Sequence, residues 1–239
     1  MPAPIEPSGG LRRHQTFTQA AHELRTPLAS IIGFTELLLK REFDPAEARE
    51  LLEIVHAQAE WMSALVGQVF DLARIESGGR AALCLAPTPV DALLVRALAG
   101  VAALDPQGRI ALALAPGLPP VAADAPRLAQ ALINALDNSL RYSAPGSAVL
   151  VGAWAAPQPE APAVLLEIRD AGPGMTPDEQ GRLFEPFWRG QRQGAGTGLG
   201  MAIFKEIMDA HGAAVELVSA PGAGTVLTIR LPAAGAIDA

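Results

Sequence analysis

The residues best suited to chemistry stand together near the start of the chain, in the segment Ala21-His22-Glu23-Leu24-Arg25-Thr26-Pro27-Leu28. The imidazole of His22 is a competent nucleophile near neutral pH when it is uncharged. Glu23 can accept or orient the imidazole proton, and Thr26 lies one helical turn on, on the same face as His22. A lone exposed histidine is more often simply solvated, but these neighbours favour attack on a phosphoryl group. We therefore predict His22, Glu23 and Thr26 as catalytic residues.

A long amphipathic helix, from about Leu11 to Arg41, must position this segment. Its apolar residues recur in alternating steps of four and three, which is typical of helices in a bundle. The seam consists of Phe17, Ala21, Leu24, Leu28, Ile31 and Leu38, with Thr35 as its polar member. His22 falls beside the seam and should face solvent. Pro27 removes the amide that would bond the Glu23 carbonyl, at about 3 kcal/mol or more, so packing alone does not explain its presence.

A second helix should begin at Asp44-Pro45-Ala46-Glu47, which offers an N-cap, a proline at N1 and an acidic N3 residue. It should end at Ser77-Gly78-Gly79. The seam repeats at Leu51, Val55, Gln58, Met62, Leu65, Val69 and Leu72. Residues 11–79 are thus predicted to form an all-α helical hairpin that dimerises into a four-helix bundle. A helical subdomain packed on the rest of the chain remains the alternative.

Composition narrows the class of protein. The 239 residues carry a net charge of −7, which argues against a nucleic-acid binder. Apolar runs are too short to span a bilayer and no signal peptide opens the chain, so we expect a soluble, cytoplasmic protein or the soluble part of a larger one. Cys84 is the single cysteine, which excludes an intrachain disulfide and a Cys-rich metal site. We expect it to be a small apolar side chain in a strand.

From Arg80 onward, short strands alternate with helices, which predicts a two-layer α+β sandwich over residues 80–232. Residues 80–89 should form a hinge and the first strand, Ala155 to Pro162 a surface loop, and residues 1–10 and 233–239 flexible ends. The expected strands are Leu83–Leu85, Ile110–Leu114, Val149–Trp154, Val164–Ile168, Val215–Val218 and Val226–Leu231. The expected helices are Val90–Leu104, Ala125–Tyr142 and Leu199–His211.

A polar cluster follows one face of the helix expected at Ala125–Tyr142. Asn134 and Asn138 lie one turn apart, and Arg141 and Tyr142 follow. Two amides buried without partners would be unfavourable, whereas amide oxygens can ligate Mg²⁺ beside phosphate oxygens. Arg141 can neutralise phosphate charge. Taken alone, the cluster is equally compatible with an exposed polar helix face.

Glycine-rich segments follow in the second half of the chain. Asp170-Ala171-Gly172-Pro173-Gly174 comes directly after a strand, and its carboxylate could accept a hydrogen bond from an adenine amine. Taken alone, however, the segment is better explained as an ordinary Gly-Pro turn. Gly194-Ala195-Gly196-Thr197-Gly198-Leu199-Gly200 opens a helix and could present amides to phosphates. It is neither a Walker loop nor a Rossmann loop, because no Lys-Ser/Thr pair follows and no strand immediately precedes it. Gly222-Ala223-Gly224-Thr225 alone would be a hairpin turn.

The order of these clusters resembles that of the sensor histidine kinases of two-component systems. His22 to Leu28 matches the H-box of that family. The asparagine pair, Asp170-x-Gly172-x-Gly174, Leu183-Phe184-Glu185-Pro186-Phe187, Gly196-x-Gly198-Leu199-Gly200 and Gly222-x-Gly224-Thr225 match its N, G1, F, G2 and G3 boxes. The resemblance covers about Thr16 to Leu231.

The resemblance implies a Bergerat (GHKL-type) ATP-binding sandwich that uses ATP and Mg²⁺. Asn138 would ligate the metal, with Asn134 and Arg141 near the phosphates, and Asp170 would read the adenine amine beside Tyr142. Gly172 and Gly174 would complete the adenine loop, with Thr225 near it. The lid would comprise Phe184, Phe187 and Arg189 at its base and Gly196, Thr197, Gly198, Leu199 and Gly200 at its end. Ala171 replaces a frequent asparagine, and the lid between Arg189 and Gly196 is short.

The resemblance further implies autophosphorylation of His22 and transfer to an aspartate on the receiver domain of a response regulator. Thr26 would support a second, phosphatase activity. The input would come from a sensor domain or a sensor protein outside this chain. A chaperone-type or topoisomerase-type ATPase is disfavoured because Asn134 stands where those enzymes carry a glutamate. A phosphatase-dominated or scaffold member that binds ATP without autophosphorylation remains the alternative. His14, His56 and His211 are expected to face solvent.

Overall fold

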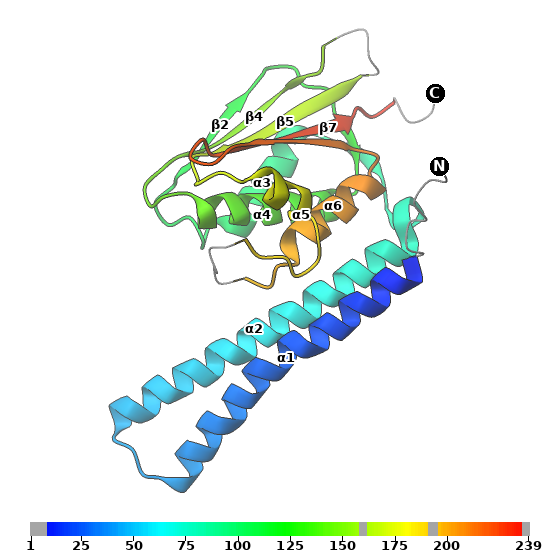
Figure 1. The fold of residues 1–239 in the computed structure, drawn as a ribbon. Helices are drawn as coiled ribbons and strands as arrows, with labels where there is room; N and C mark the ends of the chain where they lie inside the picture. Colours follow the sequence, from blue (N-terminus) through cyan, green and yellow to red (C-terminus); the bar gives the residue numbers. More distant parts are fainter. Residues whose placement is uncertain (1–8, 158–161, 191–195, 236–239) are drawn as a thin grey trace. The chain divides into compact units, whose positions relative to one another are not determined.

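The computed structural model describes residues 9–157, 162–190 and 196–235. The chain divides into two compact units, one up to Ala73 and one from Arg74. The first is a helical hairpin and the second an α+β sandwich (Figure 1), as predicted. In the described part of the chain, every helix is either too short or too polar to cross a bilayer.

The hairpin consists of α1 (Gly9–Lys40) and α2 (Pro45–Gly78). The predicted N-cap of α2 is confirmed: Oδ1 of Asp44 accepts hydrogen bonds from the N–H groups of Ala46 (2.8 Å) and Glu47 (2.9 Å). The Glu47 carboxylate accepts from the Asp44 N–H at 3.4 Å, which completes a capping box. α1 runs through Pro27 without a break.

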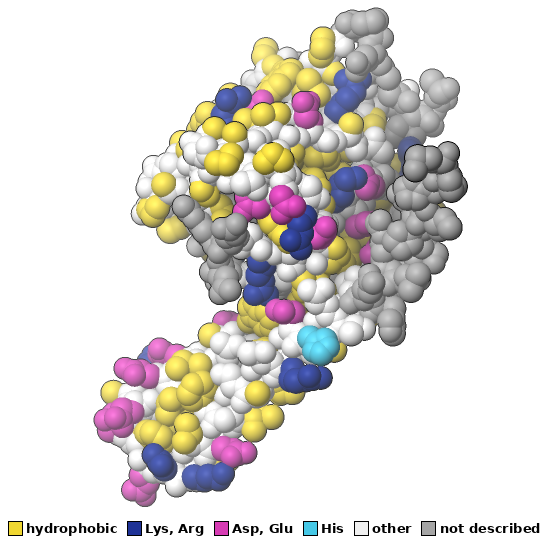
Figure 2. Space-filling model, viewed as in Figure 1, with side chains coloured by type: hydrophobic (Ala, Val, Ile, Leu, Met, Phe, Trp, Pro, Cys, Tyr) yellow, Lys and Arg dark blue, Asp and Glu magenta, His cyan; other side chains and the backbone are white. Residues whose placement is uncertain are grey.

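The seam of the hairpin is confirmed on α2 and shifted on α1. None of the predicted seam residues of α2 is exposed, and Leu65, Val69 and Leu72 are buried. Among the described side chains of α1, Thr16, Ala20 and Pro27 are buried, one position before predicted seam residues. The seam residues Leu24, Ile31, Thr35 and Leu38 are half-buried. Phe17 and Leu28, which belong to that predicted seam, are 48% and 46% exposed. Apolar side chains thus remain uncovered on the hairpin (Figure 2).

The second unit is built on a five-stranded sheet with helices on one face (Figure 1). The strand order is β2-β4-β5-β7-β6; β2 and β4 are parallel and the other pairs are antiparallel. The strands are β2 (Ile110–Leu114), β4 (Val149–Ala155), β5 (Ala163–Asp170), β6 (Ala214–Ser219) and β7 (Thr225–Pro232). The helices are α3 (Val90–Val101), α4 (Ala125–Tyr142), α5 (Pro177–Arg182) and α6 (Gly200–Ala210).

The core between helices and sheet is apolar. On α4, Leu128, Leu132 and Leu136 recur at helical spacing and are fully buried. Ile203 and Phe204 of α6 are equally buried. Full burial of each such side chain stabilises the fold by about 1.5–3 kcal/mol. The structure confirms the predicted C-terminal end of α4 at Tyr142, which is the end that borders the candidate site.

Four short elements differ from prediction. The first strand, β1, is Ala86–Thr88 rather than Leu83–Leu85, because it pairs with a strand that was not predicted, β3 (Val121–Ala123). A short 3₁₀ helix, Gly79–Ala82, precedes it. The helix α5 was also missed, although Thr176 and Glu179 form a capping box with a proline at N1.

The predictions for His211 and Cys84 are wrong. His211 is not solvent-facing but 1% exposed, because its ring closes the end of α6 and accepts a hydrogen bond from the Asp124 N–H. Cys84 is exposed and lies outside any strand. Its N–H donates to Oδ2 of Asp124 at 3.1 Å instead of joining a strand ladder. His56 is exposed as predicted, whereas the His14 side chain lies outside the described residues.

Candidate functional site

The proposed phospho-acceptor segment lies in the middle of α1. The side chains of His22 and Thr26 are exposed one turn apart, and Glu23 is half-buried beside them. Pro27 has no N–H, so the Glu23 carbonyl has no helical partner four residues on. An exposed imidazole on a long helix is accessible to a second domain or a second protein, which is what a phosphorylated histidine requires.

The asparagine face of α4 presents one engaged amide and one open amide. Nδ2 of Asn134 donates to the Gly200 carbonyl at 3.0 Å, which ties α4 to the first turn of α6. Asn138 is half-buried and forms no side-chain hydrogen bond with a described residue. Arg141 is exposed, and its Nη2 binds both carboxylate oxygens of Asp137 at 3.0 Å. To bind a phosphate as predicted, the Arg141 guanidinium must therefore either bind Asp137 and the phosphate together or leave Asp137.

Asp170 stands at the end of β5, where several donors converge on its carboxylate. The Gly172 N–H donates to Oδ1 at 2.8 Å. The Ser139 hydroxyl and the Thr225 N–H also donate to the carboxylate. Burial nevertheless raises the pKa of Asp170 above its ordinary value of 3.8, against the effect of these hydrogen bonds. Asp170 is thus a half-buried hydrogen-bond acceptor, as its predicted contact with an adenine amine requires.

Thr225 and Ser139 complete this end of the site. Thr225 lies directly opposite Asp170 in the β5–β7 register, as its predicted place near the adenine loop requires. Its hydroxyl lies 3.1 Å from that of Ser219. Ser139 was missed by the sequence reasoning. The sequence could have revealed it, because Ser139 is the single polar residue among the buried positions of α4, one turn after Leu136.

The loop after Asp170 lies against neighbouring backbone. Gly174 has a φ of +67°, and a Cβ there would lie 1.8 Å from the Ala220 carbonyl oxygen, so only glycine fits. A Cβ at Gly172 would lie 3.2 Å from the Tyr142 carbonyl oxygen. The half-buried Tyr142 therefore borders the Asp170 loop.

The base of the predicted lid is fixed by backbone contacts. Phe187 has a positive φ of 63°, and its N–H donates to the Gly198 carbonyl at 2.9 Å. Gly198 itself has a φ of +75°, and a Cβ there would lie 2.7 Å from the Phe187 carbonyl carbon. The ring of Phe184 stacks on Phe204 of α6 with centroids 6.1 Å apart. Arg189 is exposed.

The glycine-rich segment enters α6 directly. The Leu199 N–H donates to Oγ1 of Thr197 at 3.3 Å, and both side chains are buried. Leu199 is 0% exposed as a whole residue, so the structure does not bring this predicted site residue to a surface that a nucleotide could touch. Gly196 and Gly200 are half-exposed. The short lid segment predicted between Arg189 and Gly196 lies mostly outside the described residues, which resume at Gly196.

Within the described ranges, no three or more His, Cys, Asp or Glu side chains lie close enough together to bind a metal ion. The donor set does fit Mg²⁺ held jointly with phosphates, because the half-buried Asn138 offers an amide oxygen that no described residue engages.

Comparison with known proteins matches both units. The family described as His Kinase A (phospho-acceptor) domain matches residues 12–78. The family described as histidine kinase-, DNA gyrase B-, and HSP90-like ATPase matches residues 123–235.

Individual relatives are similar over nearly the whole chain. The circadian input-output histidine kinase CikA of Synechococcus elongatus is 32% identical over 222 residues, which are 89% of this chain and 29% of CikA. The solved structure of the Acinetobacter baumannii histidine kinase AdeS is 27% identical, with a TM-score of 0.71, and covers 90% of this chain and 98% of that one. The structure of full-length ShkA in complex with AMPPNP is 28% identical, with a TM-score of 0.65 over 92% of this chain and 46% of that one.

The chain spans less than half the length of the curated relatives that it matches, such as 29% of CikA and 46% of a mycobacterial sensor kinase. What it does contain is an exposed histidine in a matched phospho-acceptor domain, followed by a matched ATPase-type domain. This chain therefore belongs to the sensor histidine kinases of two-component systems, and it holds their phospho-acceptor domain and their ATPase-type domain.

Proposed function

We propose that this chain is an ATP-dependent protein-histidine kinase that phosphorylates His22 and passes the phosphoryl group to an aspartate of a response regulator. The observation that carries the proposal is that the chain contains both a candidate phospho-acceptor and a candidate metal ligand of the nucleotide site, neither of them blocked by a described residue. The imidazole of His22 is exposed on α1, and the Asn138 amide is unengaged on the face of α4 that leads to Asp170.

ATP binds along α4, with its base at one end of the helix face and its phosphates at the other. Asp170 accepts a hydrogen bond from the adenine amine, and Tyr142 and Thr225 border the base. Asn134, Arg141 and the backbone at Gly196, Gly198 and Gly200 face the phosphates. The solved complex of full-length ShkA with AMPPNP supports a nucleotide site in a protein of this fold.

Asn138 is the residue that would hold Mg²⁺ beside the phosphates. Such an ion would neutralise the charge that develops on the transferred phosphoryl group. The side chains of this unit need only position the triphosphate, because phosphoryl transfer proceeds through a loose transition state in which positioning and electrostatics do most of the work.

At His22, a ring nitrogen attacks the γ-phosphorus while the bond to the leaving ADP oxygen breaks. The proton on the other ring nitrogen passes to Glu23, which is adjacent in sequence and half-buried. The resulting phosphohistidine then transfers its phosphoryl group to a carboxylate oxygen of the receiver domain. His22 is regenerated in that step.

The hairpin of residues 11–79 forms a homodimer. Phe17 and Leu28 are about half exposed in the single chain, as are Ile32 (49%) and Leu52 (54%). Exposed apolar side chains repeating along two helices are covered when a second hairpin completes a four-helix bundle. The upstream input comes from a sensor domain or sensor protein beyond this sequence, and the dimer acts in the cytoplasm.

The hinge between the two domains lies at or just before residues 80–89. The part from Cys84 to Thr88 is held on the ATPase-type domain by the Cys84–Asp124 hydrogen bond and by pairing of β1 with β3. Gly78 and Gly79, at the end of α2, are therefore the residues best placed to change backbone conformation. Gly79 has a φ of +47°.

Incubation of the purified protein with γ-labelled ATP and Mg²⁺ tests the proposal. We expect acid-labile, base-stable label on the protein, which is the behaviour of a phosphoramidate, and no label when Mg²⁺ is chelated. ATP binding without any label would contradict the kinase and leave the scaffold or phosphatase-dominated alternative.

A further inference from the structure

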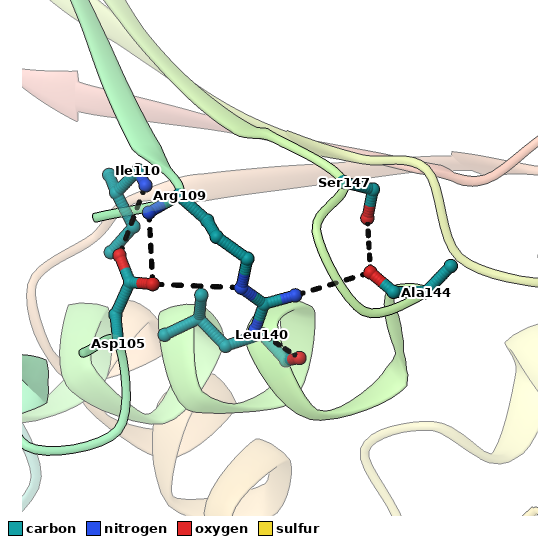
Figure 3. A network of polar contacts seen from close by, with 6 residues as sticks. All are labelled: Asp105, Arg109, Ile110, Leu140, Ala144 and Ser147. Atoms are coloured by element: carbon teal, nitrogen blue, oxygen red, sulfur yellow. Dashed lines mark hydrogen bonds and ion pairs between the residues drawn. The ribbon is translucent and has the colours of Figure 1, made fainter. Parts of the chain in front are cut away.

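A buried ion pair lies at the C-terminal end of α4, outside the residues assigned above (Figure 3). Asp105 and Arg109 come from the connection between α3 and β2. Their side chains are only 6% and 14% exposed, with Nε of Arg109 3.6 Å from Oδ1 of Asp105. The carboxylate also accepts the N–H groups of Arg109 (2.9 Å) and Ile110 (3.1 Å). Asp105 thus fixes the start of β2 and orients the guanidinium.

The guanidinium of Arg109 closes the end of α4. Nη2 donates to the Leu140 carbonyl at 2.8 Å, and Nη1 donates to the Ala144 carbonyl at 3.3 Å. The last carbonyls of a helix lack partners within it, and a cation there meets the negative end of the helix dipole. The hydroxyl of Ser147 donates to the same Ala144 carbonyl at 2.7 Å. Arg109 therefore holds both the last turn of α4 and the turn that follows it.

The turn that Arg109 holds carries the adenine end of the nucleotide site. Tyr142 lies between the two carbonyls that Arg109 binds, and its own carbonyl oxygen lies against Gly172. Ser139, which donates to Asp170, directly precedes Leu140. A displacement of this turn would move Tyr142 and Ser139 relative to Asp170.

We infer that Arg109 is a positioning residue for the adenine of ATP; this inference rests on the proposed function. Arg109 acts through the turn at residues 140–147 and not by touching the nucleotide. With the turn fixed in advance, binding does not have to order it. Without Arg109, the ordering becomes part of every binding event and weakens every ligand that has an adenine by the same factor.

The variant Arg109→Lys tests this, because lysine keeps the charge beside Asp105 but lacks the planar fork that reaches two carbonyls. We expect adenosine, ADP and ATP each to bind about tenfold more weakly, which corresponds to one charge-assisted hydrogen bond. The rate of autophosphorylation at saturating ATP should not change. Arg96→Lys, at an exposed position on α3, is the matched control and should bind all three ligands as the wild type does.

Unchanged affinities, a loss confined to ATP, or a fall in the saturated rate alone would overturn the inference. A wild-type protein that binds none of the three ligands would instead refute the proposed function. Hydrogen exchange of the wild type with adenosine gives a second readout that does not depend on the folding of a variant. Because Arg109 fixes the turn in advance, we expect the amides at 140–147 to be protected already without adenosine and to change little when it binds; a turn that becomes protected only when adenosine is present would overturn the inference.

Discussion

The N–H of Asp124 donates to Nε2 of His211 at 3.1 Å and so joins the start of α4 to the end of α6. Nδ1 of His211 lies 2.7 Å from the Ile207 carbonyl oxygen. Since Nε2 is the acceptor, the ring proton resides on Nδ1 and the imidazole is neutral. Oδ2 of Asp124 also receives the Cys84 N–H. One buried ring therefore braces both helices close to the segment that leads out of the domain.

This arrangement predicts that acid destabilises the ATPase-type domain. Burial lowers the pKa of His211 below its ordinary value of 6.5, and the nearby charge of Arg80 acts in the same direction, while Ile207 and Asp124 oppose it. Between the lowered pKa and 6.5, the unfolded chain binds a proton that the folded chain does not, so stability is present above pH 6.5 and is lost as pH falls. Urea unfolding from pH 8 to pH 5 should show this loss.

His211→Gln should flatten that pH dependence and reduce stability at pH 8 by about 1 kcal/mol, the contribution of a typical hydrogen bond. His56→Gln is the matched control, because His56 is exposed on α2 and should leave the slope unchanged. An equal slope in the wild type and His211→Gln would refute the assignment.

Asp170→Asn should separate nucleotide binding from stability. The carboxylate has a raised pKa, so its ionisation disfavours the folded state as pH rises above 3.8. The amide removes this effect and keeps an oxygen for the Gly172 N–H, but its NH₂ group cannot accept from Ser139 or Thr225. Because these effects oppose each other, Tm at pH 7 should change little. ATP affinity should fall about 10–100-fold, because a charged acceptor for the adenine amine is lost. A lower Tm with unchanged ATP affinity would assign Asp170 to the fold and not to the site.

Gly198→Ala should destabilise the junction between the lid and α6. Gly198 has a φ of +75° and lies against the Phe187 backbone, so a side chain there meets both strain and a clash. The left-handed conformation alone costs about 1–2 kcal/mol for a residue with a Cβ. Gly196→Ala is the control, since no heavy atom lies within 4 Å of its Cβ position and its φ is not positive. Thermal unfolding that is equally shifted in both variants would contradict this account.

Thr26→Ala should abolish dephosphorylation of the regulator and leave autophosphorylation of His22 intact. The hydroxyl of Thr26 is exposed one turn from His22, where it can orient a water molecule toward a phosphoaspartate docked on α1. The measurement is the decay of labelled regulator with each protein in the presence of ADP. An unchanged decay rate would remove the phosphatase from the proposed function.

The elements that could be predicted from sequence are those with strong local signals. The bounds of α4 follow from its apolar period, its Asp124 cap and its proline in the first turn, and the start of α2 follows from its capping box. The glycines of the site were found because Gly174 and Gly198 stand in ordered motifs, and the structure explains each by a close backbone approach.

The features that were missed depend on contacts between distant segments. The strand β3 has three residues and is held by pairing with β1 and by a bridge between Val121 and Ala233. His211 and Asp124 are far apart in sequence, so nothing local marks the histidine as buried. Arg109 likewise binds carbonyls of a helix that begins well after it, and no periodicity reveals an arginine turned inward. The one-residue shift of the buried stripe on α1 also reflects packing and not sequence period.

The most direct test of the central claim is the position of the phosphoryl group. Wild type, His22→Gln and His56→Gln should be incubated with γ-labelled ATP and Mg²⁺, and the labelled peptide identified at neutral or basic pH. We expect label on the peptide that contains His22 in the wild type and in His56→Gln, and none in His22→Gln. Label that persists in His22→Gln, or that resides on another peptide, would contradict the account.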